Sequence, residues 1–150
     1  MNIKKFLFYL IITFIIGGLF TPLTFSSEFY ESLVKPFDIP QIIFPIVWSI
    51  LYILMSISVY MISNTNDIKR DESIKIYFIQ LVINSLWTLF FFGLKLIGFS
   101  ALWIVLLTIV VIIMVIKFYK VKPLAAYINI PYVIWLILAT MLNISIYILN

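Results

Sequence analysis

The sequence predicts an all-α membrane protein folded as a bundle of five transmembrane helices. Of its 150 residues, 65% are hydrophobic and only 11% are charged, whereas about a quarter of the residues in a typical soluble domain are charged. The apolar residues gather in five long runs, and the charged residues lie between these runs. Because the bilayer core is about 30 Å thick and holds no water, each run is expected to form a helix that pairs its own backbone groups.

The five predicted spans form a single domain, residues 1–150, and none of them contains a charged residue. The first span follows Lys4 and Lys5 and so resembles a signal peptide, but it is too long for that role and lacks a small-x-small cleavage pattern. An uncleaved span is therefore expected. Pro45 falls in the first turn of the second span, where its missing N–H costs nothing. The spans are expected at about residues 6–25, 44–62, 76–92, 101–116 and 123–149.

The connections between the spans differ in character. The second, residues 63–75, holds the densest group of charges and is expected to be a solvated loop. The first, residues 26–43, combines Pro36 and Pro40 with acidic and aromatic side chains. Ordered loops of this length usually have a function, so the first connection is expected to form a lid over a site. A flexible linker is the alternative.

Basic residues are distributed unevenly between the two sides of the predicted bundle. The N-terminus and the second and fourth connections together carry eight Lys and Arg residues, against Lys35 and Lys95 on the other side. The positive-inside rule then places the N-terminus in the cytoplasm and the C-terminus outside. The sequence shows no internal repeat, which disfavours a transporter built from two matched halves.

Missing residue types exclude several classes of chemistry. The chain contains no Cys and no His, so no disulfide, thiolate metal site or Cys nucleophile is possible and no metal site is expected. An iron porphyrin could gain an axial bond only from Met or Tyr. The spans hold no ionisable acid or base for ordinary catalysis and no charges for an ion pathway. The basic pI of about 9.3 is attributed to membrane topology, and no nucleic-acid partner is expected.

Polar and aromatic side chains form a stripe along three of the spans. Spacings of three or four residues, as in i, i+4, i+7 or i, i+3, i+7, place such side chains on one face of a helix. These faces predict a pocket for a large, flat, apolar ligand. Alternatively, the amides bond between helices and the Trp and Tyr rings lie at the membrane interface. The stripes are Trp48, Tyr52, Met55 and Ser56; Gln80, Asn84, Trp87 and Phe91; and Tyr132, Trp135, Ala139 and Asn143.

The order of residues in three blocks resembles the TspO/MBR family, whose members are also called tryptophan-rich sensory proteins, translocator proteins or peripheral-type benzodiazepine receptors. The resemblance covers nearly the whole chain. The blocks are Phe29-Tyr30 with Lys35-Pro36 and Phe44-Pro45-Ile46-Val47-Trp48-Ser49; Gln80-Leu81-Val82-Ile83-Asn84-Ser85-Leu86-Trp87 with Phe90-Phe91; and Pro131-Tyr132-Val133-Ile134-Trp135 with Ala139 and Asn143.

This resemblance implies a protein of the bacterial cell membrane that binds tetrapyrroles such as protoporphyrin IX, as a sensor or translocator, without an obligatory cofactor. The ligand would lie between the helices under the first connection. Alternatives within the family are a transporter of sterols or other small lipophiles and a light-dependent enzyme that degrades porphyrin. No other catalytic residues are expected beyond Trp48 and Trp135 in that last case. Carried over by position, the lining residues are Tyr30, Trp48, Asn84, Trp135 and Ala139; the stripes add Tyr52, Trp87 and Asn143.

The sequence also departs from the pattern of the family. Phe29 stands where many relatives have Trp. Relatives often form homodimers through small residues in the third helix, and a homodimer is the expected assembly, but residues 80–92 contain no small-xxx-small pair to mark the interface. The C-terminal sterol-recognition pattern is absent after Tyr147, while residues 115–122 around Tyr119 fit that loose pattern.

Overall fold

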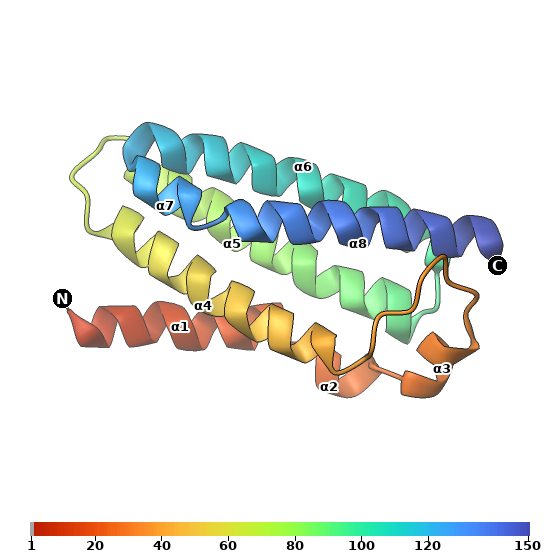
Figure 1. Cartoon of the computed structure of the whole chain (residues 1–150). Helices are drawn as coiled ribbons and strands as arrows, with labels where there is room; N and C mark the ends of the chain where they lie inside the picture. The colour runs from red at the N-terminus through yellow and green to blue at the C-terminus, as the bar shows by residue number, and fades with distance from the viewer. Residues whose placement is uncertain (1) are drawn as a thin grey trace.

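The computed structural model describes residues 2–150, which form an integral membrane protein. Five helical spans are long and apolar enough to cross a bilayer, and they run side by side with the two termini at opposite ends (Figure 1). The prediction of an all-α bundle with five membrane spans is confirmed. The spans are Ile3–Thr24, Ile43–Ser63, Arg70–Gly93, Ile97–Val121 and Pro123–Leu149.

Breaks and short helices subdivide this bundle. One further helix, α3, lies in the connection between the first two spans, and the third span ends in a π-helical turn, η1. The elements in chain order are α1 (Ile3–Gly17), α2 (Thr21–Thr24), α3 (Ser27–Ser32), α4 (Ile43–Ser63), α5 (Arg70–Thr88), η1 (Leu89–Gly93), α6 (Ile97–Val121), α7 (Pro123–Tyr127) and α8 (Ile130–Leu149).

The helices extend beyond the apolar runs. α5 begins at Arg70 and not at residue 76, so half of the predicted charged loop is helical. α6 runs from Ile97 to Val121, past both ends of the predicted span, and only Lys122 separates it from α7. Hydropathy marks where a helix leaves the hydrocarbon, but Lys, Arg and Glu are good helix formers that let it continue into water.

Two predicted spans are interrupted. The first turns between α1 and α2, and the fifth breaks at Ile128 and Asn129, between α7 and α8. At the second break, the buried Asn129 amide donates from Nδ2 to the Ala125 backbone oxygen (2.9 Å) and to Ser58 Oγ of α4 (2.7 Å). Since a backbone group freed by a helix break has no water partner in lipid, Asn129 makes this break tolerable and joins α7 to α4.

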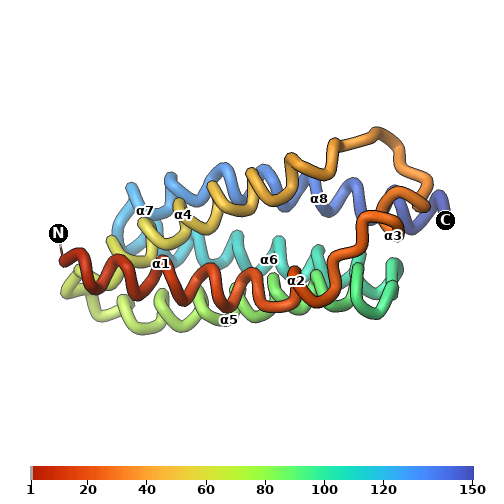
Figure 2. Tube along the Cα trace, turned by 90° about the horizontal axis from the view of Figure 1, so that it is seen from below, coloured from red at the N-terminus to blue at the C-terminus, as the bar shows by residue number. Residues whose placement is uncertain are grey.

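Helix α6 lies against α5, α7 and α8, while α1 packs against α4 and α5 (Figure 2). α4 is close to α7, but it meets α8 through aromatic rings. The ring centroids of Trp48 and Tyr132 are 6.1 Å apart, and those of Phe44 and Trp135 are also 6.1 Å apart. These rings partly fill the space between α4 and α8. The candidate site lies in the same region.

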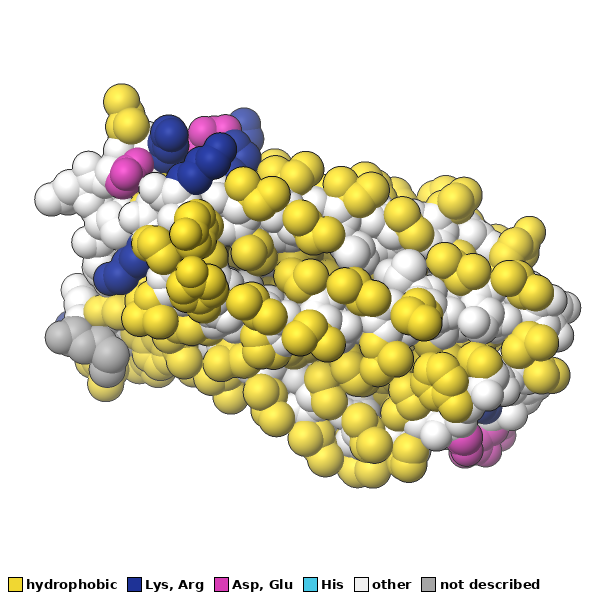
Figure 3. All heavy atoms as spheres, turned by 45° about the horizontal axis from the view of Figure 1, so that its top comes forward, with side chains coloured by type: hydrophobic (Ala, Val, Ile, Leu, Met, Phe, Trp, Pro, Cys, Tyr) yellow, Lys and Arg dark blue, Asp and Glu magenta, His cyan; other side chains and the backbone are white. Residues whose placement is uncertain are grey.

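The outer surface of the bundle is a broad apolar band (Figure 3). Leu102 and Ile134 are 72% and 62% exposed, as expected of side chains that face lipid. Lys and Arg side chains gather at the end that holds the N-terminus, and acidic side chains appear at both ends. The apolar band and the charged ends together give the molecule the surface of a membrane-spanning protein.

The first connection is an ordered cover and not an open linker. Ser26 caps α3, because its Oγ accepts from the Phe29 backbone N–H (3.2 Å). Beyond α3, the side chain of Asn150 pairs with both backbone groups of Val34: Nδ2 donates to the carbonyl (2.9 Å) and Oδ1 accepts from the N–H (3.0 Å). The end of α8 therefore holds the connection in place across the bundle.

A close approach between α1 and α4 generates a prediction about packing. A Cβ added at Gly17 would lie 2.8 Å from two ring carbons of Tyr52, which is too close for real atoms. Gly17→Ala should therefore push the Tyr52 ring aside or separate the helices, at a cost of roughly 1–3 kcal/mol. We expect a lower midpoint of thermal unfolding in detergent, followed by circular dichroism.

Ile15→Ala on the same helix is the matched control, since Ile15 is 59% exposed and faces outward. Equal melting of the Gly17→Ala and Ile15→Ala variants would show that α1 does not need glycine at this contact.

Candidate functional site

A cavity of about 510 Å³ lies between α1, α4, α5 and α8, beneath the first connection. A volume of this size is typical of pockets for small molecules, which span roughly 300–1,000 Å³. Nine of its lining residues are aromatic and none is charged. The wall is formed by Phe14, Gly18, Thr21, Phe25, Tyr30, Gln41, Ile42, Phe44, Pro45, Trp48, Ser49, Tyr52, Asn84, Trp87, Thr88, Phe91, Phe92, Ala139, Leu142, Asn143 and Ile146.

Aromatic rings form most of the cavity surface. Trp48 and Tyr52 lie one turn apart on α4, with ring centroids 5.5 Å apart. On the opposite wall, Trp87 of α5 stacks on Phe91 of η1, with centroids 5.3 Å apart and planes 22° apart. The wide π-helical turn lets Phe91 and its neighbour Phe92 both reach the wall. The cavity thus offers flat, apolar faces on two sides.

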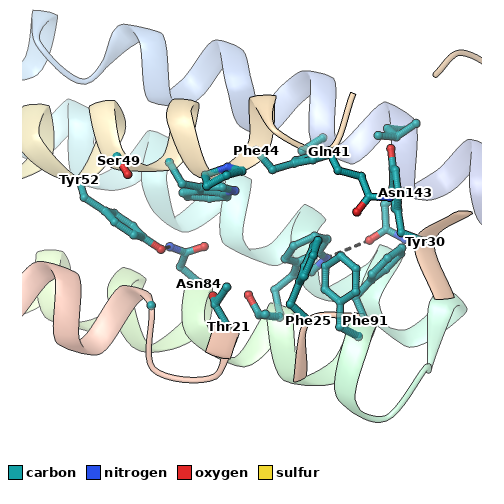
Figure 4. Close-up of a pocket in the computed structure, with 18 of the residues that line it drawn as sticks. Thr21, Phe25, Tyr30, Gln41, Phe44, Ser49, Tyr52, Asn84, Phe91 and Asn143 are labelled. Carbon is teal, nitrogen blue, oxygen red and sulfur yellow. Dashed lines mark hydrogen bonds between the residues drawn. The ribbon is translucent and has the colours of Figure 1, made fainter. Parts of the chain in front are cut away.

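Asn84 provides a polar group at one end of the cavity. Its Nδ2 donates a long hydrogen bond to the Tyr52 hydroxyl (3.4 Å). Figure 4 shows the other amide atom, Oδ1, pointing away from Tyr52 into the cavity. Among residues 2–150, nothing donates a hydrogen bond to this oxygen, so it can accept one from a ligand.

Asn143 has a different role from Asn84, although both amides reach the wall. Its Oδ1 accepts from the indole Nε1 of Trp87 (2.9 Å), and Ser100 Oγ lies 3.3 Å from both ends of the amide. These bonds tie α8 to α5 and α6. The amide of Asn143 therefore holds the helices together and fixes the Trp87 ring, with little hydrogen-bonding capacity left for a ligand.

Tyr30 closes the other end of the cavity, beneath the cover. Its side chain is 3% exposed, and its ring packs edge-on against Phe44, with centroids 5.4 Å apart. Lys35 Nζ lies 4.6 Å from the centre of the Tyr30 ring and donates to the Tyr30 backbone oxygen (2.9 Å). No group in residues 2–150 bonds to the Tyr30 hydroxyl.

Burial raises the pKa of the Tyr30 phenol, and the negative charge of Asp38 raises it further. The hydroxyl therefore stays protonated at neutral pH. A buried hydroxyl without a partner is costly. The Tyr30 hydroxyl has almost no surface open to the cavity, so a ligand acceptor would reach it only after the Tyr30 side chain moves.

The structure brings together seven of the eight predicted lining residues: Tyr30, Trp48, Tyr52, Asn84, Trp87, Ala139 and Asn143. Trp135 is not part of the wall. Its ring packs against Phe44, which does line the cavity, and its Nε1 is buried without a partner among residues 2–150. Contact between Trp135 and a ligand stays a prediction.

Sequence reasoning missed the part of the wall that comes from the first span and the cover. Phe14, Gly18, Thr21 and Phe25 line the cavity, and they follow the same i, i+4, i+7, i+11 spacing as the stripe from Gln80 to Phe91. That signal was present in the sequence. Gln41, by contrast, lies in an irregular segment, where no periodicity could indicate which way it points.

Comparisons with known proteins agree with this architecture. Residues 6–149 match the TspO/MBR family. Protein CrtK of Rhodobacter capsulatus is 37% identical over 137 residues, which cover 89% of this chain and 83% of the relative. The tryptophan-rich protein TspO of Archaeoglobus fulgidus is 33% identical over 154 aligned residues, which cover all of this chain and 99% of the relative.

A mammalian relative is also similar. The translocator protein of Sus scrofa is 32% identical over 120 residues, which cover 77% of this chain and 71% of that protein. The match to the family extends over all five spans and over every element that lines the cavity. This chain therefore belongs to the TspO/MBR family of integral membrane proteins.

Proposed function

We propose that this protein binds a flat tetrapyrrole, of which protoporphyrin IX is the type, in the cavity under the first connection, as part of a sensory or translocator role. The observation that carries this proposal is the composition of the wall, which is aromatic on two sides and free of charge. Stacking against Trp48 and Trp87 suits a large conjugated ring.

The wall gives an iron porphyrin no advantage over a metal-free ring. The inner N–H groups of a free-base porphyrin point into the centre of the macrocycle, so the Asn84 amide meets the same ring edge in both ligands. With neither His nor Cys in the chain, axial ligation adds little to the binding of haem. The carboxylates of the ligand find no cation in the wall, so they belong near the cover, where the Tyr30 hydroxyl and Lys35 lie.

The cover controls entry in this proposal. Asn150 binds both backbone groups of Val34, and Gln41 Nε2 donates to Glu31 Oε1 (2.8 Å). These polar contacts lie at the surface, but Tyr30 and Leu33 of the cover are buried against Phe91, Leu142 and Ile146. Opening the cover therefore has to separate this apolar contact, while the five spans stay packed. By the excess of basic residues at the opposite end, the cover faces outward and the N-terminus is cytoplasmic. The homodimer expected from the resemblance stays a prediction.

A titration followed by Soret absorbance and tryptophan fluorescence tests the binding site. Protoporphyrin IX should bind at least as tightly as haem, and Trp48→Ala should weaken protoporphyrin binding by about fivefold, because one stacked face is lost. Asn84→Ala should weaken protoporphyrin and haem by a similar factor, since the Asn84 amide meets the same ring edge in both ligands.

Trp103→Ala is the matched control, because Trp103 donates to the Ile83 backbone from α6 and does not line the cavity. Equal affinity of the Trp48→Ala and Trp103→Ala variants, or a low-spin six-coordinate haem complex of much higher affinity, would contradict the proposed site. The same samples followed in the dark and under illumination separate binding alone from light-dependent degradation of the porphyrin.

The two hydrogen bonds between Asn150 and Val34 of the cover lead to a prediction about the rate of ligand dissociation. Asn150→Ala removes both bonds to Val34, so the cover should open more often and bound porphyrin should dissociate several-fold faster in stopped-flow exchange. Asn64→Ala is the control and should leave the dissociation rate unchanged, because Asn64 caps the C-terminal end of α4, far from the cover. An unchanged rate for Asn150→Ala would show that the cover does not gate the cavity.

Membrane orientation is tested by labelling, because the chain has no Cys of its own. The Asp38 side chain is 83% exposed in the cover, and Ile68 is 95% exposed between α4 and α5. On intact cells, Asp38→Cys should react with a membrane-impermeant thiol reagent, and Ile68→Cys should react only after permeabilisation. The reverse pattern would place the cover in the cytoplasm.

A further inference from the structure

A second hollow lies at the other end of the molecule, where α6 meets α7 and α8. This α6–α7 groove, of about 220 Å³, is formed by Ile116, Tyr119 and Lys120 of α6, Ala126 and Tyr127 of α7, and Ile130 of α8, among others. Its floor is Ala126, which is buried, and its rims are the half-exposed rings of Tyr119 and Tyr127. The two rings meet edge-on, with centroids 5.9 Å apart.

The groove joins an apolar surface to a positive charge. Ile116 and Ile130 are 50% and 44% exposed and continue the lipid-facing band of the bundle. Lys120 is the only charged residue of its lining. Among the described residues, Lys120 takes part in no salt bridge, because the nearby Glu72 carboxylate is paired with Lys117. Lys122, at the junction of α6 and α7, has no acidic partner there either.

This end of the bundle is strongly basic. The eight Lys and Arg residues of the N-terminus and of the second and fourth connections exceed the three acids there, Asp67, Asp71 and Glu72. Figure 3 shows Lys and Arg side chains gathered at this end, next to the apolar band. Tyr rings placed where apolar surface meets charge are typical of the level of the lipid headgroups.

We propose that the α6–α7 groove is a binding site for one anionic phospholipid. An acyl chain lies along Ile116 and Ile130, and the phosphate meets the Lys120 ammonium, with Tyr119 and Tyr127 able to donate hydrogen bonds to it. A basic pocket between transmembrane helices is a recurrent site for anionic headgroups. The net charge of the lipid is what selects it, because a zwitterionic lipid carries its own cation beside the phosphate.

Other occupants fit the charge of the groove less well. A sterol has one neutral hydroxyl and leaves Lys120 without a counter-ion, although residues 115–122 fit a loose sterol-recognition pattern. An apolar helix of a second membrane protein would likewise leave Lys120 without a counter-ion. Neither has the charge complementarity that an anionic headgroup offers.

Native mass spectrometry of the full-length protein tests this site. The protein is mixed in detergent with equal amounts of phosphatidylglycerol and phosphatidylcholine, and the lipids that stay bound after removal of the detergent are identified. The wild type should retain one phosphatidylglycerol in preference to phosphatidylcholine. Lys120→Gln should reduce that preference about fivefold, the value of one lysine charge at a membrane surface. Ile130→Trp, which fills the groove and keeps the charge, should reduce retention of both lipids.

Lys75→Gln is the matched control, since Lys75 lies at the same end on α5 but does not line the groove. If Lys75→Gln lowered the preference for phosphatidylglycerol as much as Lys120→Gln does, general surface charge would explain the effect. That result would contradict a specific site in the groove. Unchanged retention in Lys120→Gln, or displacement of phosphatidylglycerol by cholesterol, would also overturn it. Porphyrin titrations of the same variants should match the wild type, so this test is independent of the cavity.

Discussion

The lack of water in the bilayer core is the constraint on which the rest of this structure depends. Most polar groups there are paired within the protein. The backbone pairs inside the helices, and side chains bond to the groups that are freed where a helix stops. Asn129 bonds to Ala125 and Ser58 at the break between α7 and α8. In the same way, Gln80 Oε1 accepts from the Tyr132 hydroxyl (2.8 Å) at the centre of the bundle. These polar contacts are rigid because no solvent competes for them.

The same constraint gives meaning to the groups that are not paired. Among residues 2–150, the buried Ser73 Oγ, Asn129 Oδ1 and Trp135 Nε1 lack partners, but these residues do not line the cavity. The amide of Asn143 joins three helices, whereas Asn84 Oδ1 and the Tyr30 hydroxyl are left without partners among the described residues. These two free groups lie at opposite ends of one aromatic cavity (Figure 4). A ligand that is flat, largely apolar and polar at its edge matches this arrangement, which is the physical basis of the proposed tetrapyrrole function.

The two ends of the bundle differ in where they offer space for a ligand. At the covered end, α4 and α8 are held apart by aromatic rings, and the first connection, bound by Asn150, closes the space between them. At the basic end, α4 packs against α7, and the outer surface is hollowed beside Lys120. One end therefore suits a ligand inside the protein, and the other suits a lipid on its surface.

The sequence by itself determined the five spans, their apolar exteriors and the faces that carry Trp48, Asn84 and Ala139, because hydropathy and helical spacing are local properties. It also contained, in Phe14 to Phe25, an unrecognised fourth stripe. The tertiary structure alone decided that Trp135 packs behind Phe44, that Asn143 is committed to Trp87, and that Asn150 reaches Val34 across the molecule. Those outcomes depend on the distance between packed helices and on which polar groups the packing brings within hydrogen-bonding distance. Neither the distance nor the pairing can be read from the sequence of a single helix.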